Sequence, residues 1–202
     1  DVAVQRVVVG GVGVGQQALG HTGEVRGVGG VGGHVAEAHL RAGYTPEAHG
    51  RYIVNAGDRV GVLLFDFAPY FSWPLTHDLK MIYRKIRFAD DLGGGTNFGS
   101  YDPGPIDAAV DHFKEMGQAK SKVIILVTDG EDDINSGAMD RLRSKIKDNN
   151  IRLYVIGVGP TLAERYVDIM RLADDVGGKT FRVETAGDLQ LVFTSIDQME
   201  RS

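Results

Sequence analysis

Apolar runs alternate with amphipathic stretches through most of the chain. Branched and aromatic residues dominate RVGVLLFDF (59–67), KVIILVTD (122–129) and IRLYVIGVG (151–159), so each of these runs predicts a strand. The run at 122–129 holds too few polar residues to face water, which favours a central position in a parallel sheet. APYFSWP (68–74) predicts another strand, at an edge of the sheet and closed by Pro74.

Helical spacing of apolar residues fills the intervals between these strands. The predicted helices run from Thr76 to about Arg87 and over 105–117, 137–150, 162–178 and 186–201, with the short strand KTFRVE before the last. Pro105 and Gly117 stand where proline and glycine are preferred at the two ends of a helix. Strands that alternate with helices predict an α/β fold, with a Rossmann-like, open and mostly parallel sheet and helices on both faces.

Residues 1–50 differ from the rest in composition. They hold 13 of the 28 glycines and four of the six histidines, and they contain no serine. GGVGVG and RGVGGVGGH are typical of low-complexity sequence, and so much glycine costs backbone entropy in a regular element. We therefore expect an atypical segment at 1–50, aberrant, frame-shifted or disordered, and a folded domain at 51–202. On this interpretation the sheet lacks a central first strand and its covering helix.

The overall composition excludes several classes of protein. The net charge of −5 does not favour a nucleic-acid partner, and the absence of cysteine excludes disulfides and thiolate metal sites. No apolar run reaches the roughly 18 residues that a membrane-spanning helix needs, so we expect no direct membrane insertion by this chain.

Candidate chemistry lies where the predicted central strand ends. Asp129 follows that strand, and the glycine-rich loop DDLGGGTNFGSYDPGP carries Thr96. Open parallel sheets bind ligands beyond the carboxyl ends of their strands, so we expect Thr96 and Asp129 to converge there. A carboxylate and a hydroxyl are oxygen ligands suited to a hard cation such as Mg²⁺. The alternatives are that Asp129 caps the following turn and that the acids at 131–133 form a solvated rim.

The motifs DDLGGGTNFG, SKVIILVTDGEDD and RLYVIGVG resemble, in this order, the von Willebrand factor type A domain. Within it, GDRVGVLLFDFAPYFSWPLTHD and the tail GGKTFRVETAGDLQLVFTSIDQMERS are most similar to the bacterial BatA/BatB aerotolerance-type proteins. The resemblance covers residues 51–202. It implies a non-catalytic protein-interaction module with a metal-ion-dependent adhesion site, where Mg²⁺ or Mn²⁺ takes a carboxylate from a protein partner. It also suggests a soluble domain of a bacterial membrane-tethered protein.

The family's metal site has three parts, and the resemblance places two of them here. Its threonine falls on Thr96 and its strand-end aspartate on Asp129, and the partner-binding rim then comprises Gly95, Asn97, Gly130 and Glu131. The remaining part, Asp-x-Ser-x-Ser after the first strand, is missing because no serine precedes Ser72. Asp1 has neither hydroxyl at the required spacing. We therefore expect a degenerate or incomplete site that holds Mg²⁺ or Mn²⁺ weakly, because the serine ligands are missing.

A second reading concerns the glycine-rich start of the chain. Gly13-x-Gly15-x-x-Ala18 follows an apolar run, as the fingerprint of a nucleotide-binding enzyme would. Further glycines interrupt the helix that this fingerprint needs. No set of nucleophile, base and orienting group is visible, and His77 and His112 lie on predicted helices without a motif partner.

Overall fold

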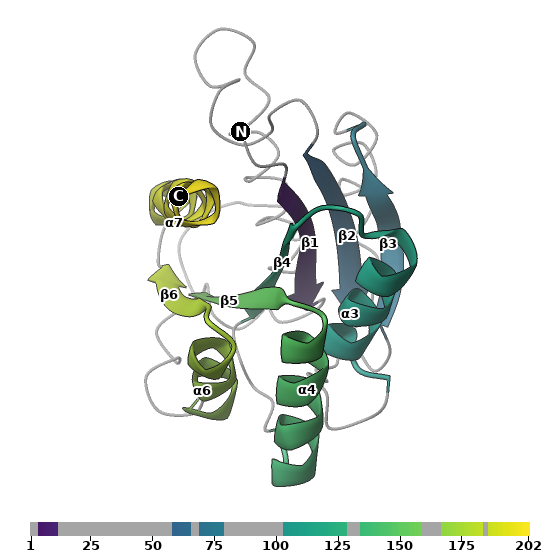
Figure 1. Cartoon of the computed structure of the whole chain (residues 1–202). Helices are drawn as coiled ribbons and strands as arrows, with labels where there is room; N and C mark the ends of the chain where they lie inside the picture. Colours follow the sequence, from purple (N-terminus) through teal and green to yellow (C-terminus); the bar gives the residue numbers. More distant parts are fainter. Residues whose placement is uncertain are drawn as a thin grey trace, which may run out of the picture.

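The computed structural model describes residues 4–11, 58–65, 69–78, 103–128, 134–158, 167–183 and 186–202. In these residues a six-stranded sheet lies between helices (Figure 1). The strands are β1 (Val4–Gly11), β2 (Arg59–Phe65), β3 (Pro69–Thr76), β4 (Ser121–Thr128), β5 (Ile151–Val158) and β6 (Lys179–Val183). The helices are α3 (Pro105–Met116), α4 (Ser136–Asp148), α6 (Val167–Asp175) and α7 (Ala186–Arg201).

The strand order is β3-β2-β1-β4-β5-β6. Every neighbouring pair is parallel except β2 and β3, which are antiparallel. The prediction of an open, mostly parallel sheet is confirmed, and so are the central position of β4 and the edge position of β3. Pro74 does not close β3, because the strand continues to Thr76.

Strand β1 corrects the interpretation of the first fifty residues. Val4–Gly11 lies in the middle of the sheet, and Val7 pairs with Gly61 of β2 on one side and with Ile124 of β4 on the other. The expectation that the sheet lacks a central first strand was wrong. The glycine-rich composition of the whole segment hid one short run, VQRVVVGG, whose branched valines suit a buried strand. Residues 12–50 lie outside the described residues.

The two faces of the sheet carry different helices. Val7, Ile124, Leu126 and Leu153 are fully buried on one face and belong to the core that α3, α4 and α6 complete. Residues of the other parity, among them Arg6, point to the face where α7 lies, because successive side chains of a strand alternate between faces. Figure 1 shows α7 on one side of β5 and β6, with α4 and α6 on the other. Helices on both faces are thus confirmed.

Local signals explain where the helices begin and end. Pro105 occupies the first turn of α3 as predicted, and the Asn135 side chain caps α4 by accepting the N–H of Ala138 at 2.9 Å. Gly177, with φ of +78°, follows α6 in the left-handed conformation that favours glycine. The helix predicted at 162–178 is described over Val167–Asp175, and residues 159–166 lie outside the described part.

The helix predicted from Thr76 to Arg87 falls mostly outside the described residues, which resume at 103 after residue 78. Thr76 is the last residue of β3, and its Oγ1 accepts the N–H of Asp78 at 3.0 Å. His77 lies in a bend, not in a helix.

Candidate functional site

The carboxyl ends of β1 and β4 meet at one edge of the sheet. Gly10 pairs with Val127, so the last residues of the two strands, Gly11 and Thr128, reach this edge at neighbouring positions. Thr128 is buried, and Asp129 follows it in the chain. In the strand order observed here, the connections diverge between β1 and β4, which is where open α/β sheets bind ligands.

The residues predicted for the site lie outside the described part of the chain. They are Thr96 and Asp129 as metal ligands, and Gly95, Asn97, Gly130 and Glu131 as the partner-binding rim. Their neighbours along the chain are described, since β4 ends at Thr128 and the segment before α3 ends at Gly104. The convergence of Thr96 and Asp129 stays a prediction.

The carboxyl end of β1 offers no side-chain oxygen. The chain there reads Gly10-Gly11-Val12-Gly13-Val14-Gly15, where the family's pattern requires an aspartate and two serines after the first strand. Asp1 precedes β1 in the chain and therefore cannot follow its carboxyl end. A divalent cation held without these ligands keeps most of its water, because one hydroxyl and one carboxylate replace little of an octahedral shell. The sequence after β1 thus departs from the family's ligand pattern, and weak binding of Mg²⁺ stays a prediction.

Asp107 anchors the end of the segment that carries Thr96. Its side chain is fully buried in the first turn of α3, and its Oδ2 accepts the N–H of Gly104 at 3.3 Å. Arg141 and Lys145 of α4 donate to the same carboxylate at 2.8 and 3.1 Å. These bonds fix α3 against α4 at the point where the chain enters the helix. The sequence signal was an acid in the first helical turn matched by two cations four residues apart.

Lys145 also pairs with Asp111 at 3.0 Å. Burial lowers the pKa of Lys145, but its hydrogen bonds to Asp111 and Asp107 outweigh burial and leave the pKa raised. Lys145 therefore remains charged and keeps both carboxylates paired at neutral pH.

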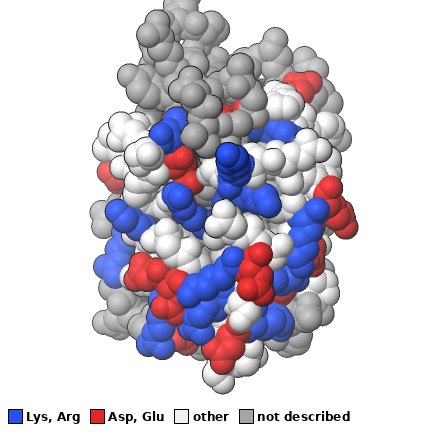
Figure 2. Space-filling model, viewed as in Figure 1, with Lys and Arg blue, Asp and Glu red and all other residues white. Residues whose placement is uncertain are grey.

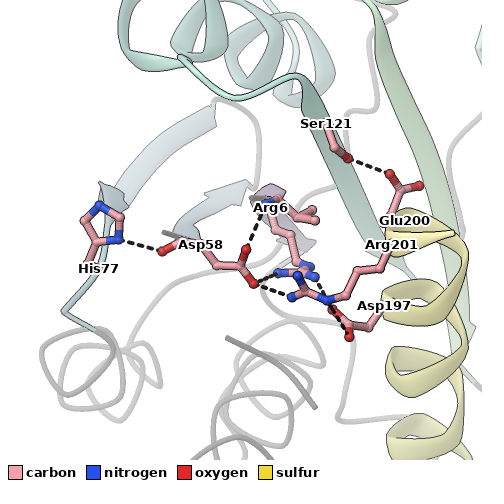
Figure 3. Close-up of polar contacts among 8 residues, drawn as sticks. Arg6, Asp58, His77, Ser121, Asp197, Glu200 and Arg201 are labelled. Carbon is pink, nitrogen blue, oxygen red and sulfur yellow. Dashed lines mark hydrogen bonds and ion pairs between the residues drawn. The ribbon is translucent and has the colours of Figure 1, made fainter. Parts of the chain in front are cut away.

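A second polar cluster lies on the opposite face of the sheet, near the amino ends of the strands (Figure 3). Arg6 donates to Asp58 at 3.1 Å and to Asp197 of α7, and Arg201 of α7 bonds to the same two aspartates. Asp58 also accepts the N–H of Val4 at 2.8 Å. Two cations face two anions, so this cluster attaches α7 to β1 and to the start of β2. Sequence patterning did not predict this cluster, because Arg6 lies in the atypical segment 1–50.

Glu200 continues this polar layer along α7. It accepts hydrogen bonds from Tyr154 at 2.6 Å, Ser121 at 2.7 Å and Arg152 at 3.0 Å. Burial and then Glu200 raise the pKa of Tyr154, so its hydroxyl stays protonated. These contacts hold α7 on β4 and β5.

Charges of both signs interleave elsewhere on the surface. Figure 2 shows basic and acidic side chains mixed over the region of α4 and α6, and Arg143 pairs there with Asp140 at 2.6 Å and with Asp175 at 2.7 Å. No group of three or more His, Asp or Glu with the geometry of a metal site occurs within the described ranges.

The comparisons with known proteins identify the family. The sequence profile of the von Willebrand factor type A domain matches residues 49–195, and the chain belongs to this family. Solved structures share its fold. An aerotolerance-related membrane protein from Bacteroides fragilis NCTC 9343 superposes with a TM-score of 0.66 at 14% identity, over 98% of each chain. BatB from Bacteroides thetaiotaomicron gives 0.67 at 16% identity, over 99% of this chain and 100% of that one.

A third similar structure is the vWF domain of the type V pili tip protein Mfa5 from Porphyromonas gingivalis. It has a TM-score of 0.60 and 13% identity, over 98% of this chain and 95% of that chain. A search of curated proteins finds no match. The resemblance to the type A domain and to the aerotolerance-type proteins is confirmed, the latter at the level of the fold.

Proposed function

We propose that this chain is a non-catalytic protein-interaction module that binds its partner at the carboxyl edge of the sheet. The observation that carries the proposal is the meeting of β1 and β4 at this edge, with Asp129 next in the chain after buried Thr128. Membership of the type A family supports it. So do two pilus proteins of similar fold, the pili tip protein Mfa5 and the PilB minor pilin from Streptococcus sanguinis.

Thr96 and Asp129 are the central residues of the proposed face, and Gly95, Asn97, Gly130 and Glu131 form its rim. Glycines in both segments let a partner's backbone approach closely. The metal site is incomplete because the end of β1 carries only glycine and valine, so Mg²⁺ or Mn²⁺ binds weakly.

We propose, more specifically, that the protein partner contributes a carboxylate to this face. The segment after β4 holds four acids, Asp129, Glu131, Asp132 and Asp133, and like charges at close range repel. A carboxylate is therefore accepted only where a cation offsets these charges. A partner that binds equally well without any divalent cation must present neutral or basic groups instead.

Calorimetry tests the metal part of this proposal. Mg²⁺ and Mn²⁺ are titrated into the wild type and into Asp129→Ala, with Asp148→Ala, an exposed acid at the end of α4, as the matched control. We expect weak binding that Asp129→Ala abolishes and the control retains. Equal heats in all three proteins, or none in any, remove the metal from the proposed face.

Titration with acetate, monitored by the NMR shifts of the Thr96 and Asp129 amides, tests whether this face binds a carboxylate. We expect shifts in the presence of Mn²⁺ or Mg²⁺ that chelation reverses. Shifts of the same size after chelation would show that the carboxylate needs no cation.

The nucleotide-binding enzyme remains a second candidate because of one observation. Strand β1 ends at Gly11, two residues before Gly13-x-Gly15-x-x-Ala18, which is the place of a dinucleotide fingerprint. The glycines that follow and the family membership argue against it. Saturable binding of NAD or ATP that Gly13→Val abolishes would favour this candidate over the interaction module.

We further propose that the chain is a domain of a membrane-tethered bacterial protein, in line with the similar membrane protein from Bacteroides fragilis. Within the described residues, no helix combines the length and the apolar character needed to cross a membrane. Fractionation of cells that make the full-length protein tests the proposal, and recovery without membranes would contradict it.

A further inference from the structure

Edge strand β3 carries a bulge near its carboxyl end. Val62 pairs with Trp73 and Val60 with Thr76, so three steps along β3 correspond to two along β2. The extra residue falls at Pro74-Leu75. Proline has no N–H to donate, and the irregularity leaves Leu75 to find partners outside a regular ladder.

Two side chains bind the backbone of Leu75 from neighbouring elements. His112 of α3 accepts the Leu75 N–H on its Nε2 at 3.0 Å, and Arg59 of β2 donates to the Leu75 carbonyl at 2.9 Å. Arg59 also donates to the carbonyl of Met116 at the end of α3, at 2.8 Å. Both Leu75 and His112 are buried, so neither bond is easily replaced by water.

The bulge also needs Gly61 on the neighbouring strand. A Cβ at this position would lie 3.2 Å from the Leu75 nitrogen and 3.4 Å from the Trp73 carbonyl oxygen. The backbone of β3 therefore approaches β2 closely here. Helix α3 contacts the bulge through the imidazole of His112.

The bond from Leu75 exists only while the His112 ring is neutral, because a protonated Nε2 becomes a donor that faces another donor. Among the described residues, the charged groups that act on this ring are Glu115, on its own helix, and Arg59, on β2. Beyond Thr76, β3 leads to His77 and Asp78, which are exposed. Burial, opposed by Glu115 and reinforced by Arg59, lowers the pKa of His112.

His77 provides an internal contrast. Its Nδ1 lies 2.7 Å from the carbonyl oxygen of Asp58, which only accepts, so the ring donates in this bond (Figure 3). Protonation of His77 leaves that donor in place. The two histidines near the end of β3 thus have opposite hydrogen-bonding roles, since His77 donates and His112 accepts.

We propose that His112 is a pH-dependent latch on the bulge of edge strand β3, closed when the imidazole is neutral and opened when it takes a proton. In the open state the Leu75 N–H has no acceptor, and the new positive charge lies near Arg59. The segment Pro74–Thr76 then separates from α3 and from β2, which exposes the edge of β2 at Val60.

Amide hydrogen exchange at Leu75 tests the latch in the whole chain. Protection, corrected for the intrinsic exchange rate, is measured from about pH 8 to about pH 5, a range that spans histidine titration. We expect a fall of roughly tenfold in the wild type, as the loss of one buried acceptor predicts. His112→Gln keeps an acceptor that does not titrate, so its protection should be flat, whereas His77→Gln should behave as the wild type does.

A flat wild-type profile, or a fall of the same size in His112→Gln, overturns the proposal. Should His112→Gln fail to fold, ¹⁵N shifts of the His112 ring in the wild type decide instead. An unprotonated Nε2 at neutral pH that titrates together with the Leu75 amide shift supports the latch. A ring protonated on Nε2 at neutral pH excludes it.

Discussion

Arg6 of β1 and Asp197 of α7 form a buried ion pair across 191 residues of sequence. The same arginine pairs with Asp58, and Arg201 closes the cluster. The cluster joins the first strand of the sheet to the last helix of the chain. Since all four groups are removed from bulk water or nearly so, each charge depends on the others for its stability.

Arg6→Met should therefore destabilise the fold although it introduces an apolar side chain of similar length. It removes from Asp58 and Asp197 a cation with which both are paired, and removal of one partner from a buried ion pair costs about 3–5 kcal/mol. Urea denaturation measures the loss. Lys114→Met is the matched control, because its pair with Asp111 is half exposed and screened by water, which limits its contribution to about 1 kcal/mol. Equal losses in the two variants would contradict the structural role of Arg6.

The sequence predicted most elements but not this cluster, for a physical reason. Strands such as β4 and helices such as α3 have a periodicity and end signals that are local in the chain. Strand β1 lacks such end signals, because the glycine-rich sequence continues after Val4–Gly11. An arginine in such a segment is expected at the surface, whereas Arg6 is buried. Its partners are 52 and 191 residues away, and only the fold shows that they are near.

The candidate site, too, could be predicted from the sequence only in part. The departure of the carboxyl end of β1 from the family's ligand pattern is visible in the sequence, whereas the place of β1 in the sheet needed the structure. Asp107 was overlooked because an acid in the first turn of a helix usually faces solvent, and here α4 covers it with Arg141 and Lys145.

His112 should make the global stability depend on pH. Its folded-state pKa lies below the ordinary 6.5, so the unfolded chain binds the proton more readily than the folded chain does. The contribution of His112 is complete above about pH 6.5 and decreases as the pH falls from there to the folded-state pKa, below which it is lost. Urea midpoints across this window should fall in the wild type and less in His112→Gln.

Asp111 provides a control for the His112 prediction, because its own contribution to stability is lost at lower pH. Burial raises its pKa, but hydrogen bonds to Lys145 and Lys114 outweigh burial and hold the pKa below 3.8. Its contribution is present above that value and is lost as the pH falls further. Asp111→Asn should thus leave the neutral-to-mildly-acid decrease unchanged, and a change in that window would assign the decrease to carboxylates instead of His112.

Two glycines should respond in opposite ways to alanine. A Cβ at Gly178 would lie 1.7 Å from the carbonyl oxygen of Leu153, so the backbone must shift, at a cost of about 1–3 kcal/mol or more. At Gly137, in the first turn of α4, the nearest atom is the Asn135 Oδ1 at 3.5 Å, an ordinary contact. Gly137→Ala should stabilise the protein by about 0.5–1 kcal/mol through helix propensity. Thermal unfolding measures both, and a stable Gly178→Ala would contradict the packing between β5 and the turn after α6.

Gly11→Asp tests whether the end of β1 limits metal binding. It adds a carboxylate at the carboxyl edge, beside Thr128, the residue that precedes Asp129. If Thr96 and Asp129 converge there, the added ligand should raise the affinity for Mg²⁺ by tenfold or more over the weak wild-type binding, because a charged oxygen replaces water in the metal's shell.

Calorimetry with Mg²⁺ measures this gain, and Gly11→Asn is the matched control, since its neutral amide has a similar size and should gain much less. The double variant Gly11→Asp/Asp129→Ala should lose the gain, because the two carboxylates act on one ion. A gain that survives removal of Asp129 would place the cation elsewhere, and no gain in a folded Gly11→Asp protein would mean that Thr96 and Asp129 do not share a site with the end of β1.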